Sequence, residues 1–211
     1  MMKAKAIRYF KFFQNEGLTT MKISKFIPLT RNRLTMLFSL VLLTISVTSV
    51  AKDEIVRGPI IKGYGPVYAV TDRSVKLPEN YTYKVAFDIA RSGSAPDQIN
   101  RSLESVARYI NMHGINGVSM DKMDLAVVIH GQASKDLLSN KAYSDKFLFD
   151  NPNIEMVEKL RAVGVKFYIC GQSLYFGGFQ KKDLEHPEDL ALSAMTMLTV
   201  LQGEGYQFVP K

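Results

Sequence analysis

The sequence predicts an α/β fold in which a parallel sheet is covered by helices on both faces. Apolar runs with strand character alternate with segments of helical periodicity, and several runs end abruptly at a polar residue or at glycine. Such alternation is typical of right-handed βαβ units, whose strands lie parallel and whose helices pack against the sheet. The pattern occupies residues 81–211, which we expect to form the folded domain.

The first half of this domain shows two strand patterns around one helix pattern. Tyr83–Ile89 is predicted as a strand, and Asp97–Met112 as a helix whose apolar residues recur at helical spacing. Gly114 is expected to stop this helix. Leu125–Ile129 is an almost unbroken β-branched run, as expected for a strand that helices cover on both faces.

The second half continues the alternation and adds four helical segments and two strands. The helical segments are predicted at 134–138, 140–147, 153–163 and 187–202, and the strands at 165–169 and 206–209. The last helix carries its apolar residues in one stripe and is expected to end at Gly203.

Residues 52–80 precede the domain and have the composition of turns. Gly58-Pro59, Gly63-Tyr64-Gly65-Pro66 and Leu77-Pro78 leave only short apolar stretches between them. We expect an extended N-terminal arm that lies on its own domain or on a neighbouring subunit.

Residues 1–51 have the pattern of a secretory signal peptide. Basic residues precede the apolar run Leu34–Val50, which ends in small residues before the charged Lys52. Met21 is an alternative start that gives a signal of ordinary length. An uncleaved membrane anchor is the competing interpretation, but the run is near the lower limit for a span, and the small residues favour cleavage after Ala51. The protein is therefore expected to be periplasmic or secreted, without stable membrane insertion.

The formal charge of +7 comes almost entirely from the leader. Eight of the 27 Lys and Arg residues, but only one of the 20 acidic residues, lie within residues 1–51, so the rest of the chain is formally neutral. A basic surface for nucleic acid therefore has no support, and no nucleic-acid partner is expected.

Cys170 is the only cysteine, and it stands at the end of a predicted strand before Gly171-Gln172-Ser173. A single cysteine excludes an intrachain disulfide. At the carboxyl end of a strand it faces the ligand crevice of an open α/β sheet, and the amides of the next helix favour its thiolate. The alternative is an inert buried side chain that only fills the core.

Asp88 and His130 follow two other predicted strands. If the strands are parallel, these side chains share one rim of the sheet with Cys170, where His130 is a candidate base for the thiol. The alternatives are a loop hydrogen bond for His130 and a turn or helix cap for Asp88. His113 is explained by a positive charge in the last turn of a helix, and His186 lies in a charged loop. No paired spacing of His and Cys predicts a metal site.

The stretch Lys84–Pro210 resembles the DsrE/DsrF-like family, whose members act in sulfur oxidation and sulfur relay, and is most similar to its exported single-domain branch. The matching pieces are Lys84–Asp88, Arg108–Met112, Ala126–Gly131, Phe149–Asn153, Tyr168–Ser173 and Leu201–Tyr206. The resemblance implies a flavodoxin-like three-layer αβα sandwich with a mostly parallel sheet of about five strands. It also implies a homo-oligomer and a persulfide on Cys170.

Two functions follow from this reasoning. The first is sulfur handling, in which Cys170 accepts and relays sulfane sulfur, His130 assists, and Asp88, Gly171, Gln172 and Ser173 contact the substrate. Its partners would be thiol or persulfide proteins, and no cofactor is expected.

The second function is that of an oligomeric protein that binds a small ligand without catalysis and keeps Cys170 inert. A cysteine hydrolase is disfavoured because no oxyanion-loop motif accompanies the thiol. Relay members work in the cytoplasm, so their substrates do not transfer to an exported chain.

Overall fold

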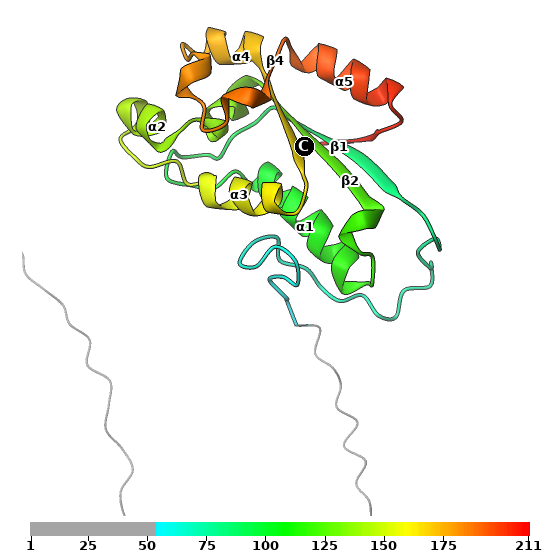
Figure 1. Ribbon diagram of the computed structural model, residues 1–211. Coiled ribbons are helices and arrows are strands. Elements are labelled where there is room, and N and C mark those ends of the chain that lie inside the picture. The colour runs from blue at the N-terminus through cyan, green and yellow to red at the C-terminus, as the bar shows by residue number, and fades with distance from the viewer. Residues whose placement is uncertain (1–53) are drawn as a thin grey trace, which may run out of the picture. The chain divides into compact units, whose positions relative to one another are not determined.

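The computed structural model describes residues 54–211, and the predicted signal peptide lies outside them. Their five strands form one sheet in the order β4-β3-β2-β1-β5, with every neighbouring pair parallel. The strands are β1 (Tyr83–Ile89), β2 (Met123–Ile129), β3 (Lys166–Cys170), β4 (Leu190–Ala191) and β5 (Gln207–Pro210). The predicted α/β class, with a flavodoxin-like three-layer arrangement, is confirmed (Figure 1).

Five α-helices connect and cover these strands. They are α1 (Arg101–Ile115), α2 (Asn140–Phe147), α3 (Ile154–Ala162), α4 (Gly171–Phe176) and α5 (Ala194–Gly203). Short 3-10 segments at 120–122, 131–137, 181–183 and 187–189 complete the connections. Within residues 54–211, none of the helices combines the length and apolar character that a bilayer span requires.

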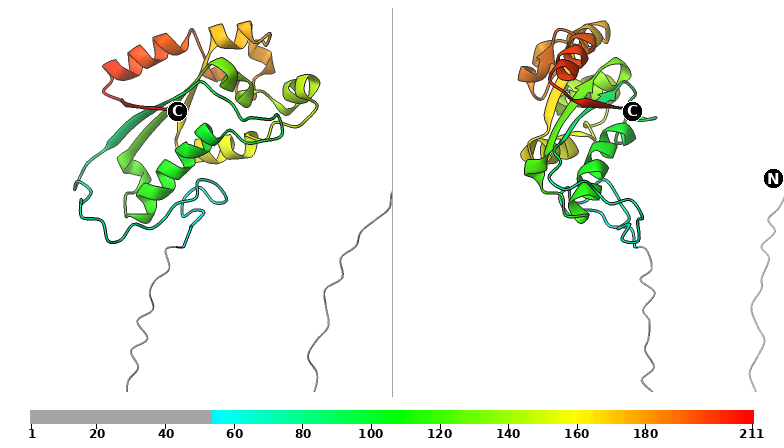
Figure 2. Two further views of the ribbon diagram at one scale, coloured as in Figure 1. Left: turned by 180° about the vertical axis from the view of Figure 1, so that it is seen from behind. Right: turned by 90° about the vertical axis from the view of Figure 1, so that its right-hand side faces the viewer.

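The direction of the crossovers decides which face each helix covers. The chain advances from β1 to β4 in one direction, and right-handed connections then place the intervening helices on one face. From β4 the chain returns past the whole sheet to β5, beside β1, and the reversal places α5 on the opposite face. Figure 2 shows the sheet between α5 and the pair α1 and α3. A large core with Phe87 and Ile129 lies on the α1 side, and a smaller one with Ala86 and Val128 lies under α5.

The last helix begins later than the sequence predicts. The prediction of one helix over 187–202 is wrong, because Leu190–Ala191 form the edge strand β4 and α5 begins only at Ala194. Leu190 pairs with Ile169 of β3, so a residue assigned to the helical stripe belongs to the sheet. Apolar spacing alone does not distinguish a short strand from a helix turn. Ser193 marks the true start, since its side chain accepts a hydrogen bond from the Thr196 amide at 3.1 Å.

Helix α1 is also displaced from its predicted bounds of 97–112. It starts after Asn100, whose side chain caps the amides of Ser102 and Leu103, and it continues through Gly114 to Ile115. Gly114 therefore does not stop the helix. A Cβ at this position would lie 2.5 Å from Cδ1 of Ile60, so glycine allows the arm to pack closely on the helix.

The N-terminal arm lies along α1 of its own chain, and the buried side chain of Asn111 holds it. The Asn111 oxygen accepts hydrogen bonds from the amides of Ile60 and Ile61 at 3.1 and 2.8 Å. Its amide nitrogen donates to the carbonyls of Ile61, Tyr64 and Gly65. Ile61 is only 1% exposed and belongs to the large core, so the arm is part of the folded domain.

We expect Asn111→Ala to detach the arm from α1. The substitution leaves buried amides and carbonyls of residues 60–65 without partners, and it should lower the free energy of unfolding by about 2–4 kcal/mol. Denaturant unfolding measures the loss, and hydrogen exchange should accelerate at residues 60–65 far more than in β2. Gln202→Ala, at the exposed end of α5, is the control and should change neither quantity. Unchanged exchange in the arm of Asn111→Ala would contradict this account.

Candidate functional site

Cys170 ends β3 at the place where the connections change face. The connection that leaves β3 enters α4, whose Leu174 packs in the core on the α1 side. The connection that leaves β4 enters α5 on the other side, and Cys170 and Ala191 are register partners on these two strands. A switch of this kind opens a crevice outside the carboxyl ends of parallel strands, where ligands bind in open α/β proteins.

Two helices direct backbone N–H groups at the Cys170 sulfur. Cys170 is the N-cap of α4, and its Sγ accepts a hydrogen bond from the Ser173 amide at 3.4 Å. The amides of Gln172 and of Ala194, in the first turn of α5, also hydrogen-bond the sulfur. The beginnings of both helices carry partial positive charge, so the arrangement favours a negative charge on the sulfur.

The hydrogen bonds lower the pKa of Cys170. Burial by itself raises this pKa, but the hydrogen bonds from Ser173, Ala194 and Gln172 outweigh the burial, so the pKa lies below its ordinary value. Because the thiolate is the nucleophilic form, a lowered pKa increases the reactive fraction at neutral pH.

Ser173 contributes its hydroxyl as well as its amide. The Ser173 Oγ accepts a hydrogen bond from the Gly131 amide at 2.9 Å, and its own proton is therefore available to the Cys170 sulfur. The contact joins the start of α4 to the loop that follows β2. Gly171 is needed here for a different reason, since a Cβ would lie 2.8 Å from the Ala191 carbonyl oxygen.

His130 and Asp88 form a pair beside the cysteine. The His130 Nε2 and the Asp88 Oδ1 are 2.8 Å apart, and both side chains are about one-third exposed. Ile129 pairs with Ile169, so His130 and Cys170 follow at adjacent positions, and the alternation of strands directs both side chains and Asp88 to the α5 face. The three strand-end residues thus share one rim. His130 is hydrogen-bonded to Asp88, and no hydrogen bond within residues 54–211 joins it to Cys170.

One contributor to the site is absent from the residues singled out in the sequence. Ala194 supplies its amide to Cys170 from a helix that the sequence pattern places several residues too early. Ser193, just before the apolar run, is the sequence signal for the true start of this helix, because serine is a preferred N-cap residue. Of the predicted substrate contacts, Gln172 has an exposed side chain, and its backbone reaches the sulfur.

The other two histidines have structural roles. His113 stands in the last turn of α1, as the sequence predicts, but burial lowers the pKa of this imidazole, and its Nδ1 donates to the Tyr109 carbonyl. His186 contacts the carboxylates of Glu158 and Glu188 at 2.7 and 3.0 Å. In the part of the chain that the structure describes, no three His, Cys, Asp or Glu residues converge in a group that could hold a metal ion.

The Cys170 sulfur is poorly accessible to solvent. The residue is 5% exposed, and a neighbouring cavity of about 290 Å³ is lined by Ser173 and Gly131 but not by Cys170. Leu192 and Met195, which stand on either side of the Ser193-Ala194 start of α5, are 71% and 77% exposed. A reagent must therefore be small, or α5 must move, before the sulfur reacts.

We expect alkylation of Cys170 by iodoacetamide to report the lowered pKa. The pH at which the rate is half-maximal should be lower for the folded protein than for the protein in urea, because only the folded chain holds the amides on the sulfur. Ser173→Ala removes the hydroxyl and should raise this pH, whereas His130→Gln should leave it unchanged. A folded midpoint at or above the urea midpoint would refute the assignment.

Comparison with known proteins assigns the chain to a family. The model of the DsrE/DsrF-like family matches residues 84–210. A solved structure of a protein of unknown function from Methanobacterium thermoautotrophicum is similar, with 22% identity and a TM-score of 0.46 over 61% of this chain and 99% of that one. No curated protein matches this sequence. The family match spans the sheet and both helices around Cys170, and the chain belongs to the DsrE/DsrF-like family.

Proposed function

We propose that this protein handles sulfane sulfur and that Cys170 carries the sulfur as a persulfide. The observation that carries the proposal is the convergence of amides from α4 and α5 on one sulfur atom. Such a cradle favours an anion, and both the thiolate and the persulfide of Cys170 are anions. Membership of the DsrE/DsrF-like family supports the same chemistry.

The transfer takes place in two exchange steps. The Cys170 thiolate attacks the outer sulfur of a donor persulfide, the S–S bond of the donor breaks, and the donor thiolate leaves with the electron pair. An acceptor thiolate then attacks the outer sulfur on Cys170, and the Cys170 thiolate leaves. Each step forms one S–S bond and breaks another, so no external oxidant or reductant is required.

His130 serves this exchange as a proton donor to the thiolate that leaves the donor. Its position beside Cys170 on the rim suits that role, and the bond to Asp88 holds the ring in place. Ser173, Gly171 and Gln172 surround the sulfur from the α4 side, where the hydroxyl and amides stabilise the terminal sulfur. Asp88 acts on the substrate only through His130.

The partner is a protein thiol or a small persulfide that meets the exposed apolar side chains at the start of α5. Leu192 and Met195 offer an apolar contact surface next to the buried sulfur. We place the protein in the periplasm or outside the cell, after removal of residues 1–51, and as a homo-oligomer. The mass of the purified exported protein and its size by light scattering test these two statements.

A second function is favoured by the burial of the sulfur. Cys170 is 5% exposed, as expected if the thiol only completes the small core under α5. In this alternative the protein binds a ligand at the same rim without covalent chemistry.

Incubation with sodium tetrasulfide distinguishes the two functions. For a sulfur carrier, the intact mass should increase by one sulfur atom, and a thiol such as glutathione should remove the added mass. The reaction should fail in Cys170→Ser. His130→Gln should slow the loading at least severalfold, because the trisulfide that leaves the tetrasulfide then lacks its proton donor.

The matched control is His186→Gln, which removes a histidine that contacts Glu158 and Glu188 and should load normally. A folded wild-type protein that gains no sulfur, while the same protein in urea is modified at Cys170, would overturn the carrier proposal and leave the binding alternative.

A further inference from the structure

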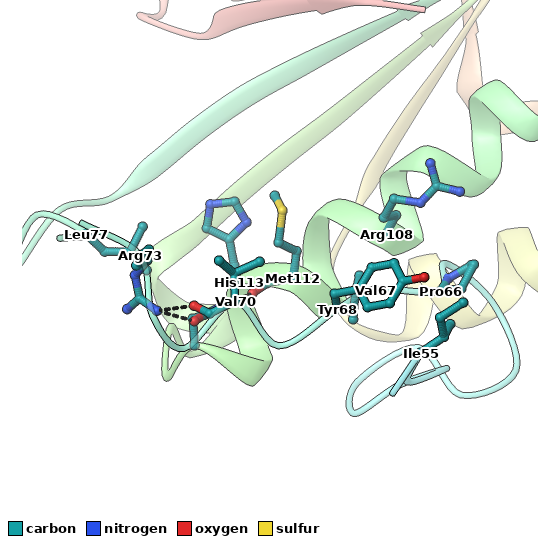
Figure 3. Close-up of a pocket in the computed structure, with 11 residues that line it drawn as sticks. Ile55, Pro66, Val67, Tyr68, Val70, Arg73, Leu77, Arg108, Met112 and His113 are labelled. Atoms are coloured by element: carbon teal, nitrogen blue, oxygen red, sulfur yellow. Dashed lines mark hydrogen bonds between the residues drawn. The ribbon is translucent and has the colours of Figure 1, made fainter. Parts of the chain in front are cut away.

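A cavity of about 610 Å³ lies between the N-terminal arm and α1, and it shares no residue with the cysteine site. Arm residues 55–77 form one wall, and residues 108–116, in the second half of α1 and at its C-cap, form the other (Figure 3). We call it the arm groove. It lies by the C-terminal end of α1, which leads into the start of β2, whereas Cys170 stands at the carboxyl end of β3. Its volume is in the usual range for small-molecule sites.

The walls of the arm groove are held in place. Asn111 fixes residues 60–65 on the helix side, and Val56 and Val67 pair through two backbone hydrogen bonds of 2.8 and 2.9 Å. Ile61 anchors the arm in the core. The groove is thus a preformed feature of the folded domain.

The lining is apolar and remains exposed. Ile55, Tyr68 and Val70 on the arm are 52%, 51% and 51% exposed, and Met112 on α1 is 42% exposed. A ligand that covers these side chains gains about 25 cal/mol of binding free energy for each Å² of apolar surface that it removes from water. Exposed apolar side chains gathered in this way are typical of a surface that binds a ligand.

The charge of the arm groove is positive and uncompensated. Arg73 and Arg108 belong to the lining, which contains no Asp or Glu. Within residues 54–211 neither guanidinium forms an ion pair, and Arg73 is held only by neutral oxygens, the Val70 carbonyl at 3.0 Å and the Asn116 Oδ1 at 2.7 Å. These two bonds use one nitrogen of Arg73 and leave its other donors available (Figure 3). His113 adds no charge at neutral pH, because burial lowers its pKa.

We propose that the arm groove binds a small amphipathic anion, with an apolar chain or ring against Tyr68 and Met112 and an anionic head on Arg73. A carboxylate fits the fork of the guanidinium, which the bonds to Val70 and Asn116 orient in advance. Arg108 lines the opposite end of the groove from Arg73 and adds a second, more remote positive charge to the lining (Figure 3). The apolar contacts provide affinity, and the guanidinium selects for charge.

Calorimetric titration of the purified protein with decanoate, and separately with 1-decanol, tests this proposal. Decanoate should bind saturably with one molecule per chain. Arg73→Gln should weaken decanoate at least tenfold and leave decanol within about twofold, because only the head group loses its partner. Arg108→Gln should weaken decanoate by a smaller factor. Met112→Trp, which fills the apolar part at an exposed position, should remove binding of both probes.

Arg57→Gln is the matched control, since it removes the same charge from an exposed arm position outside the lining and should bind decanoate normally. Absence of saturable decanoate binding, or equal binding by Arg73→Gln and the wild type, would overturn the proposal. A concentration-dependent dimer that Met112→Glu dissociates, without decanoate binding, would also overturn it, because the groove would then be a contact between copies.

Discussion

The right-handed crossover is the constraint that brings chemistry to Cys170. The connections from β1 to β4 advance in one direction, while the connection to β5 returns, so α4 and α5 leave the sheet toward opposite faces. Cys170 directly precedes α4, and its register partner Ala191 ends β4 with two residues between it and α5. The beginnings of both helices therefore lie at one sulfur, although α5 starts 24 residues later in the chain than Cys170. A crossover of the other hand would place α5 elsewhere and leave the thiol with one helix.

Small side chains under α5 allow its first amide to reach the sulfur. The core on this face contains Ala86, Ala126 and Ala194, which let the helix approach the sheet closely. A larger residue at any of these positions would lift the start of α5 and lengthen the contact between the Ala194 amide and the sulfur. Burial under the helix opposes ionisation of the thiol, but the same approach brings the amides that favour it. The small core and the lowered pKa are thus consequences of one packing arrangement.

The sequence predicts β1, β2, β3, β5 and the strand-end residues well, because these depend on local apolar runs, but it assigns the two-residue strand β4 to a helix. Tyr83–Ile89 is observed with the predicted bounds, and Asp88, His130 and Cys170 share a rim, as parallel strands require. A local sequence pattern does not predict the hydrogen bonds that these residues form with distant parts of the chain. The bond of His130 to Asp88 joins residues 42 apart in sequence, and the amide of Ala194 belongs to a helix whose start the apolar spacing conceals. The partners of Asn111 lie 46 to 51 residues away. The local sequence of the arm therefore predicts its turns but not its attachment to α1.

Helix α1 is the physical link between the rim and the arm groove. Its N-cap Asn100 donates to the buried Asp136 at 2.7 Å, near the carboxyl ends of the strands, and Met112 lines the groove at its other end. Fifteen helical residues span about 22 Å, which exceeds the Debye length of about 8 Å in physiological salt. A charge bound in the groove therefore has little direct influence on the thiolate. Coupling between the two sites would require α1 to shift as a body against the sheet, and the buried bonds of Asn100 and Asn111 oppose such a shift.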